Sequence, residues 1–306
     1  MKLAQRITTT GARAGAARPR RWLPGAAALL ALALLAGDAT AEPSPRPAAA
    51  QPDTAPQRIV SLNLCTDQLL MQLVEPGRIR AVSYLARDPR SSALFEEARN
   101  LPATSGVAEE VIALKPDLVL AGTFSTRATV AILRQLGYRV VEFEPEYGFA
   151  GIIANIRAMA AAVGERARGE AMVRRIEAEL ARLPAPPASR PIFANYAANG
   201  YTSGNGALVT EIANLAGFET LGQRLGLAGT QPVNLEQMLT ERPDLIDIGE
   251  DYGAPALATE LFRHPALRRL LREQTSIELD PRHTACGSPL TLHAVRALLA
   301  ARRRLD

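Results

Sequence analysis

The sequence predicts a mixed α/β fold with two lobes of alternating strands and helices, a long α-helix joining the lobes, and a cleft between them. Three features support this fold. Short apolar segments rich in Val and Ile alternate with segments of helical periodicity, as parallel βαβ units require. The alternation stops over residues 149–183, where only helical periodicity is present. A pattern of 14 residues occurs once before and once after that interruption.

The positive charge of the chain is concentrated at its N-terminus. The 306 residues include 35 Lys and Arg against 31 Asp and Glu, a net charge of +4. Six of the basic residues and one acid lie in the first 41 positions, so the rest carries 29 basic and 30 acidic residues, a net charge of −1. This balance argues against a nucleic-acid-binding body. The apolar fraction of 47% excludes wholesale disorder.

The N-terminus has the pattern of a secretory signal peptide. Basic residues in positions 2–21 precede an apolar run at 26–36, which is too short to span a bilayer, and then Ala39-Thr40-Ala41. We expect residues 1–41 to be removed and the mature protein to reach the periplasm. An uncleaved membrane anchor is the alternative, and Arg20-Arg21 leaves general and twin-arginine secretion both open. Residues 42–56 contain five prolines and are predicted to be a flexible linker.

The first lobe is predicted over residues 57–148. Apolar, β-branched segments predict buried strands at 58–62, 79–82, 118–121 and 138–141. Helical periodicity predicts helices at 109–114 and 127–136, and a helix after the first strand with Thr66 as its N-cap.

Two helices are predicted over residues 149–185, between the lobes. Ile152, Ile156 and Met159 form one apolar stripe. A second stripe, from Val173 to Leu183, follows Gly164 and ends before a run of prolines that begins at Pro184. The second helix is expected to be roughly 28 Å long, enough to run across both lobes.

The second lobe is predicted over residues 186–306, where the alternation resumes. The strands are expected at 191–195, 245–248 and 276–279, and the helices at 208–215, 235–239, 267–271 and 290–301. Each lobe would then be a Rossmann-like arrangement of strands and helices.

The two halves share one pattern without gaps. Residues 109–122 read EEVIALKPDLVLAG and residues 236–249 read EQMLTERPDLIDIG. Glu, Pro, Asp, Leu and Gly coincide, and the common unit is a helix, a basic-Pro-Asp turn and a buried strand. This repeat predicts two similar lobes.

The order of these elements resembles the helical-backbone (class III) substrate-binding proteins of ABC importers, which serve iron–siderophores, haem and cobalamin. The resemblance covers residues 57–306 and rests on the opening RIVSL, the phrase ALKPDLVL at 113–120, LGYRV at 136–140, and the AGF at 216–218. It implies a ligand held between the lobes and delivered to a permease dimer. Many relatives carry a lipid-attachment Cys after the leader, and this chain has none there.

Ligands of open α/β sheets bind beyond the carboxyl ends of the strands, so the residues after each strand are the candidates for ligand contact. Aromatic plates suit a bulky chelate, and arginines suit an anionic one. A solvated, ion-paired or core position is the alternative for each. The candidates are Asn63, Cys65, Tyr84, Arg87, Phe124, Arg127, Tyr147, Asn199, Tyr201, Asp251, Tyr252, Arg282 and His283.

The cysteines and histidines leave several interpretations open. Cys65 and Cys286 both follow strands, and a structural disulfide, two free thiols and ligand contact are all compatible with the sequence. The only histidines are His264, His283 and His293, and none has the spacing of a metal site. We therefore predict no dedicated metal site and no cofactor.

Glu109 and Glu236 are equivalent positions of the repeat. In the family that the chain resembles, an acidic residue on each lobe docks into arginines of the permease, and these two glutamates match that motif. A favourable interaction with the helix macrodipole is the alternative role.

The resemblance implies a monomeric receptor that captures a ferric siderophore, haem or cobalamin, with a hinge limited by the connecting helix. The mature chain lacks Trp, because Trp22 lies in the leader, and this mildly favours an anionic iron chelate over cobalamin. The alternative is an exported two-lobed enzyme. It finds little support, because G-x-S-x-G, Walker A and H-E-x-x-H motifs are all missing from the sequence. The Gly-rich segment at 203–206 is a weak anion-binding signal.

Overall fold

The computed structural model describes residues 54–249 and 256–305. The predicted signal peptide, most of the predicted linker, and the candidates Asp251 and Tyr252 lie outside the described residues. Within the described residues, no helix combines the length and the apolarity needed to cross a membrane.

The first half of the described chain forms a parallel five-stranded sheet with the order β3-β2-β1-β4-β5. β1 lies in the middle, and its three residues are fully buried. The strands are β1 (Ile59–Ser61), β2 (Ile79–Ser83), β3 (Ala103–Thr104), β4 (Leu118–Gly122) and β5 (Val140–Phe143), and the α-helices between them are α1 (Leu64–Leu73), α2 (Phe95–Ala98), α3 (Ala108–Ala113) and α4 (Arg127–Gln135).

Helix α1 begins earlier than the sequence predicted. Its N-cap is Asn63, whose side-chain Oδ1 accepts a hydrogen bond from the backbone N–H of Cys65. The predicted cap, Thr66, lies inside the helix, where its hydroxyl donates to the carbonyl of Asn63 and contacts the Ser61 hydroxyl. The prediction was wrong because both Asn and Thr are good caps and only the fold decides between them.

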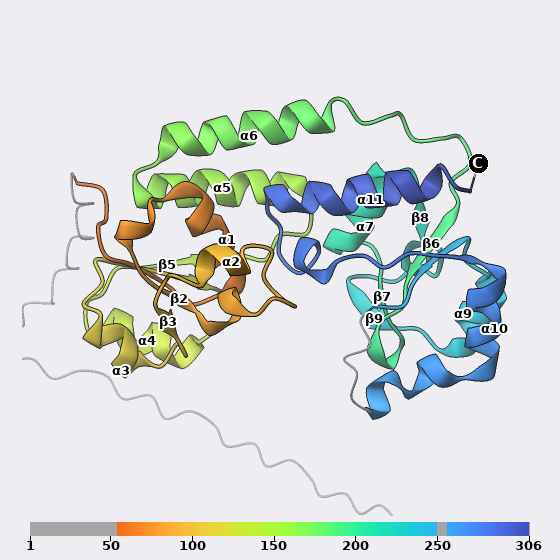
Figure 1. Ribbon diagram of the computed structural model, residues 1–306, viewed down its shortest axis with the longest axis horizontal. Helices are drawn as coiled ribbons and strands as arrows, with labels where there is room; N and C mark the ends of the chain where they lie inside the picture. The colour runs from red at the N-terminus through yellow and green to blue at the C-terminus, as the bar shows by residue number, and fades with distance from the viewer. Residues whose placement is uncertain (1–53, 250–255, 306) are drawn as a thin grey trace, which may run out of the picture. The chain divides into compact units, whose positions relative to one another are not determined.

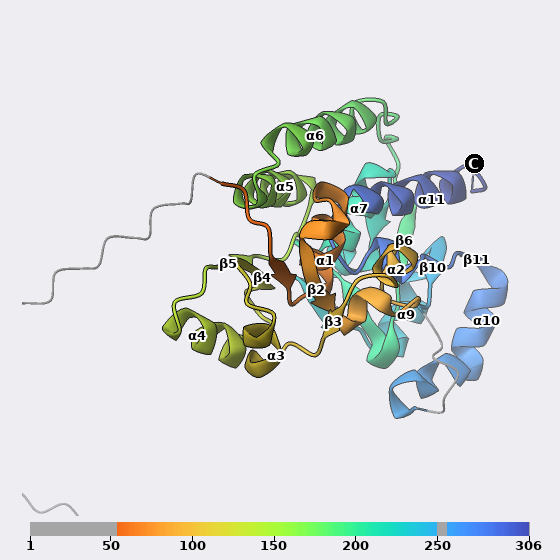
Figure 2. The same ribbon diagram turned by 60° about the vertical axis from the view of Figure 1, so that its left-hand side comes forward.

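Helices α5 (Phe149–Val163) and α6 (Arg166–Leu180) form an antiparallel pair, with α6 on the outside (Figures 1 and 2). The chain reverses at Gly164, whose φ of +80° favours glycine. Gly169 of α6 lies against Ala160 of α5, where an added Cβ would come within 2.4 Å of the alanine Cβ. Helix α6 has 15 residues, which is about 22 Å rather than the predicted 28 Å. It ends at Leu180, three residues before the predicted end.

The second half contains a parallel four-stranded sheet with the order β11-β10-β6-β8, and an antiparallel ribbon of β7 and β9. The strands are β6 (Ile192–Asn195), β7 (Tyr201–Ser203), β8 (Glu219–Thr220), β9 (Thr230–Pro232), β10 (Leu245–Asp247) and β11 (Thr275–Ser276). The α-helices are α7 (Leu208–Leu215), α8 (Leu221–Arg224), α9 (Leu235–Glu241), α10 (Pro265–Glu273) and α11 (Leu292–Arg302).

Short 3₁₀ segments occupy several of the connections. They are η1 (Pro76–Arg78), η2 (Tyr84–Arg87), η3 (Ala198–Gly200), η4 (Leu257–Arg263), η5 (Pro281–His283) and η6 (Pro289–Thr291). Segments η2, η3 and η5 follow strand ends, and each contains residues predicted to contact ligand.

The repeated motif adopts the same structure in both halves. The basic residue before the proline has a left-handed backbone in each case, with φ of 47° at Lys115 and 45° at Arg242. The next acid, Asp117 or Asp244, then accepts a backbone N–H at the start of the first strand of its own sheet. Asp117 accepts from Arg58 at 3.0 Å and Asp244 from Ile192 at 2.7 Å. In both halves, therefore, the repeat connects the turn before one strand to the start of the first strand of the same sheet through an aspartate hydrogen bond.

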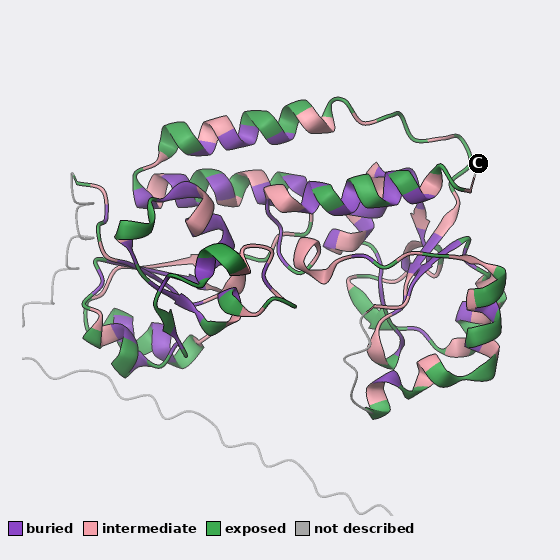
Figure 3. Ribbon diagram, viewed as in Figure 1, coloured by how far each residue is buried: buried purple, intermediate pink, exposed green. Residues whose placement is uncertain are grey.

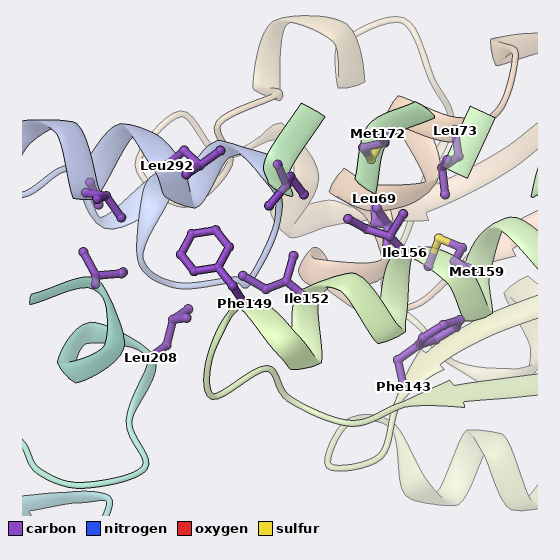
Figure 4. Close-up of a cluster of buried hydrophobic side chains, with 14 of the residues drawn as sticks. Leu69, Leu73, Phe143, Phe149, Ile152, Ile156, Met159, Met172, Leu208 and Leu292 are labelled. Carbon is purple, nitrogen blue, oxygen red and sulfur yellow. The ribbon is translucent and has the colours of Figure 1, made fainter. Parts of the chain in front are cut away.

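The largest hydrophobic core is shared by the two halves of the described chain. Figure 3 shows buried residues along both α5 and α11, and Figure 4 shows Phe149 and Ile152 of α5 near Leu208 of α7 and Leu292 of α11. Val60 and Val119 belong to a separate cluster in the first half, and the second half has a cluster of its own. The lobes are thus joined by packed side chains as well as by the chain.

Candidate functional site

An open cavity of about 430 Å³ lies at the carboxyl ends of β1, β4 and β5 and faces loops of the second half. This is the edge at which α/β sheets bind ligands. The lining residues are Asn63, Cys65, Thr66, Leu69, Gly122, Thr123, Phe124, Ser125, Phe143, Glu144, Pro145, Glu146, Tyr147, Met159, Ser203, Gly206, Ala207, Leu208, Val209, Gly229, Thr230, Thr284, Ala285 and Gly287.

Asn63 organises the first-half wall of the cavity. Its Oδ1 caps α1, and its Nδ2 donates to the Ser125 hydroxyl at 3.2 Å. The backbone of Gly122 approaches both side chains, because an added Cβ would lie 3.0 Å from Ser125 Oγ and 3.2 Å from Asn63 Nδ2. The wall is therefore preformed, with a fixed amide beside a hydroxyl.

The loop between β5 and α5 brings two carboxylates to the cavity. The Thr123 hydroxyl donates to Glu144 Oε2 at 3.0 Å, and Asn155 Nδ2 donates to Glu146 Oε1 at 2.7 Å. Glu144 is exposed, whereas Glu146 is half-buried, and burial raises the pKa of the Glu146 carboxyl. Phe124 and Tyr147 project from the same region with 69% and 60% of their surface exposed.

The second-half wall consists of small polar and apolar groups. Ser203 lies at the end of β7, where Asn195 Nδ2 donates to its hydroxyl at 3.1 Å. Ala207 and Leu208 begin α7, Thr230 belongs to β9, and residues 284–287 form the loop before α11. The polar groups that this wall presents to a ligand are side-chain hydroxyls and backbone groups, and none of its side chains is charged.

Cys65 and Cys286 form a disulfide that ties the first turn of α1 to the loop before α11. Their Cα atoms are 5.1 Å apart, although 221 positions separate them in sequence. The structure thus selects the disulfide over two free thiols, and Cys65 still lines the cavity. Beside the bond, an added Cβ at Gly287 would lie 2.4 Å from the Glu146 Cβ, so the two halves touch closely here. The seam between the halves is covalently fixed at the cavity.

Of the predicted ligand residues in the described parts of the chain, four line the cavity: Asn63, Cys65, Phe124 and Tyr147. The other seven are outside that lining. Tyr84 and Tyr201 are exposed aromatics, with 61% and 45% of their surface accessible. Asn199 lies within η3 in a left-handed backbone conformation with φ of 57°.

The predicted arginines and His283 have protein partners. Arg87 donates to the backbone carbonyls of Ala98 and Leu101. The Arg127 guanidinium lies 5.9 Å from the centre of the Phe124 ring. Their counterparts in the second half are similar: Arg282 forms a forked pair with Asp280, and the His283 ring stacks on His293 at 4.8 Å. Among the described lining residues, none is Arg, Lys or His.

Several lining residues were missed by the sequence analysis. Glu144 and Glu146 directly follow β5, so the rule that selected Tyr147 applies equally to them. Ser203 and Thr230 were missed because β7 and β9 are only three residues long and are not apolar runs. The described residues contain no group of three or more His, Cys, Asp or Glu side chains placed to hold a metal ion.

Comparison with known proteins places this fold among binding proteins. The family model described as "Periplasmic binding protein" matches residues 59–270. A cobalamin-binding protein of Halobacterium salinarum is 26% identical over 203 residues, which is 64% of this chain and 55% of that protein. The chain thus spans about half the length of the curated relatives it matches.

Solved structures agree on the fold. The apo periplasmic heme-binding protein RhuT from Roseiflexus sp. RS-1 aligns with a TM-score of 0.66 and 22% identity, over 80% of this chain and 98% of that one. The vitamin B12-binding protein BtuF of Vibrio cholerae aligns with a TM-score of 0.60 and 19% identity, over 82% and 98% of the two chains. A periplasmic heme-binding protein from Pseudomonas aeruginosa aligns with a TM-score of 0.63 and 22% identity, over 80% and 92%.

These proteins are two-lobed binding proteins rather than enzymes. The family model covers more than two thirds of the sequence, and the two parallel sheets with a cavity between their loops have the architecture of its members. The chain belongs to the periplasmic binding protein family.

Proposed function

We propose that the chain is the substrate-binding protein of an ABC importer, which captures a metal chelate and delivers it to a membrane permease dimer. The chelate is a ferric siderophore, haem or cobalamin. The observation that carries this proposal is the open cavity of about 430 Å³, lined from both halves, in a member of the periplasmic binding protein family. The cobalamin-binding and heme-binding titles of its relatives support the choice of ligand class.

The aromatic residues at the cavity suit a large, flat or bulky chelate. Phe124 and Tyr147 are mostly exposed, so a ligand that covers them removes apolar surface from water. Asn63, Ser125 and Ser203 would orient the ligand through hydrogen bonds. The predicted ligand residues that do not line the cavity are still proposed to contact the outer part of a bound chelate. They include the exposed Tyr84 and Tyr201, and Arg127 beside the Phe124 ring.

Glu109 and Glu236 are the proposed docking residues for the permease. Both are exposed and lie in the first turn of a short helix, α3 and α9. Neither takes part in an ion pair within the described residues, so both carboxylates are available to arginines of a partner. Equivalent positions on the two lobes suit a permease with two equivalent subunits.

Capture is proposed to involve only modest movement of the lobes. The shared core between α5, α7 and α11 and the Cys65–Cys286 disulfide both resist separation of the halves. We also propose that the leader is cleaved and that the mature protein works as a monomer in the periplasm. The family implies a periplasmic or extracellular location.

Purification of the mature protein from the periplasm, with its own leader, tests this function. The visible absorption spectrum and the native mass of the purified protein should reveal one chelate per chain. Release by mild denaturation should return the chelate unchanged, because a receptor does not consume its ligand. A sugar or amino acid bound in its place would overturn the chelate assignment.

A further inference from the structure

We propose that Glu144 and Glu146 make this receptor selective for chelates whose rim presents N–H donors, such as primary carboxamides, over chelates whose rim presents carboxylates. The inference rests on the proposed function and names the class of chelate that the cavity accepts. It differs from the expectation of an anionic iron chelate, which relied on the absence of Trp from the mature chain.

The first support is the charge of the lining. Glu144 and Glu146 are the only Asp, Glu, Lys, Arg or His side chains among the described lining residues. Arg282 pairs with Asp280, and Arg127, whose guanidinium lies 5.9 Å from the centre of the Phe124 ring, is outside the cavity lining. A carboxylate entering this cavity therefore meets like charge in a partly desolvated space, where repulsion is stronger than in water.

The second support is the fixed position of Glu146. Asn155 holds one carboxylate oxygen at 2.7 Å, and the close approach of Gly287 limits movement of the side-chain stem. Burial makes the negative charge of Glu146 costly, and a donor from the ligand would reduce that cost. A ligand carboxylate would increase it. Because Glu146 is fixed in a partly buried position, the cost of burying its charge favours ligands that present N–H donors over ligands that present carboxylates.

The third support is the match between the remaining polar groups and amides. Thr123 directs one oxygen of Glu144, and Ser125 and Ser203 provide hydroxyls that accept as well as donate. A carboxamide has both a donor NH₂ and an acceptor C=O, so it can use a glutamate and a neighbouring hydroxyl together. A carboxylate can only accept, and each glutamate it faces would lack a donor.

The test compares two corrinoids that share one ring and one metal. One carries its peripheral groups as amides, as cobinamide does, and the other carries them hydrolysed to carboxylates. Wild-type protein should bind the amide form at least about 100-fold more tightly at neutral pH. The Glu144→Gln/Glu146→Gln variant should reduce this ratio to about tenfold or less, chiefly by binding the carboxylate form better.

Gln keeps the shape of Glu and can still accept from Asn155, so the variant should remain folded, as thermal unfolding will verify. Glu177→Gln is the control, because Glu177 lies on the outer helix α6 and does not line the cavity. It should keep the wild-type ratio. An unchanged ratio in the double variant would assign the selectivity to other residues and overturn the inference.

The outcomes separate the inference from the proposed function. If wild type binds the carboxylate corrinoid or haem, a dicarboxylate, as tightly as the amide form, the inference fails and the receptor function stands. If siderophores alone bind, a preference for an anionic ferric catecholate over a neutral ferric hydroxamate also overturns the inference. If no corrinoid, haem or ferric siderophore binds, the proposed function fails and the inference fails with it.

Discussion

Single side chains at the cavity serve the fold and the site together. Asn63 caps α1, orients Ser125 and lines the cavity. The sequence identified Asn63 because it follows a strand, yet it assigned the cap to Thr66. Glu146 was missed although it follows β5 as Tyr147 does, and its side chain is held by Asn155, nine positions along the chain, and approached closely by Gly287. Local patterns thus predict which loops form the site more readily than which side chains face it.

Asp67 is a fully buried carboxyl outside the cavity lining, and it predicts a pH dependence of stability. It accepts hydrogen bonds from the Ser83 N–H and hydroxyl, but burial is the larger effect and raises its pKa from 3.8 to about 7. In that interval the folded protein retains a proton that the unfolded chain releases. Stability therefore falls as pH rises through this window.

The Asp67→Asn substitution should remove this contribution, because an amide does not ionise and can still bond to Ser83. We expect wild type to lose up to about 4 kcal/mol more than the variant between pH 4 and pH 8. Denaturant unfolding at both pH values measures the difference. Burial also raises the pKa of Asp247, to about 6, but that effect is common to both proteins and cancels. Parallel pH profiles for the two proteins would contradict the assignment.

At the scale of elements, the apolar runs predicted β1, β2, β4, β5, β6 and β10 within a residue or two. The two-residue strands β3 and β8 and the ribbon of β7 and β9 were not predicted, because they are short and are defined by pairing rather than by apolarity. The predicted helix extended past Leu180 because Leu183 continues the apolar spacing. The helix ends at Leu180, yet Leu183 still packs against the core.

The Cys65–Cys286 disulfide links helix α1 covalently to the loop before α11. Closing so long a segment reduces the freedom of the unfolded chain, so the Cys65→Ser/Cys286→Ser variant should lose about 2–5 kcal/mol of stability. Denaturant unfolding without reductant measures the loss. A reducing agent should destabilise the wild type and leave the variant unaffected. Two titratable thiols in unreduced wild type would show that the bond does not form.

For the whole molecule, the repeat in the sequence predicted two similar halves, and the structure extends the similarity to the left-handed residues Lys115 and Arg242. The sequence could not predict that α5, α7 and α11 would share one core, because apolar periodicity shows that a face is buried but not against what. The cavity therefore lies where the two halves are held together both by the shared core and by the Cys65–Cys286 disulfide.

The proposed docking to the permease uses one glutamate from each half, Glu109 from the first and Glu236 from the second. Glu109→Arg/Glu236→Arg should reduce uptake in cells by about tenfold or more, since each reversal replaces attraction to a permease arginine with repulsion. Affinity for the chelate should be retained, because both residues lie outside the cavity lining. Glu97→Arg/Glu177→Arg, on the exposed surfaces of α2 and α6, makes the same change in net charge and should leave uptake normal. Normal uptake with the docking variant would disprove the role.

A metal chelate is proposed to bind in the cavity between the two sheets, and an equilibrium titration followed by the visible absorption of the chelate measures this binding. We predict saturation at one chelate per chain, without consumption of the chelate. The Phe124→Ala/Tyr147→Ala variant should bind at least about tenfold more weakly, and Leu136→Ala, an exposed site at the end of α4, should bind normally. No saturable binding of any of the three chelate classes, or wild-type affinity in the aromatic double variant, would show that the cavity is not the site of chelate binding.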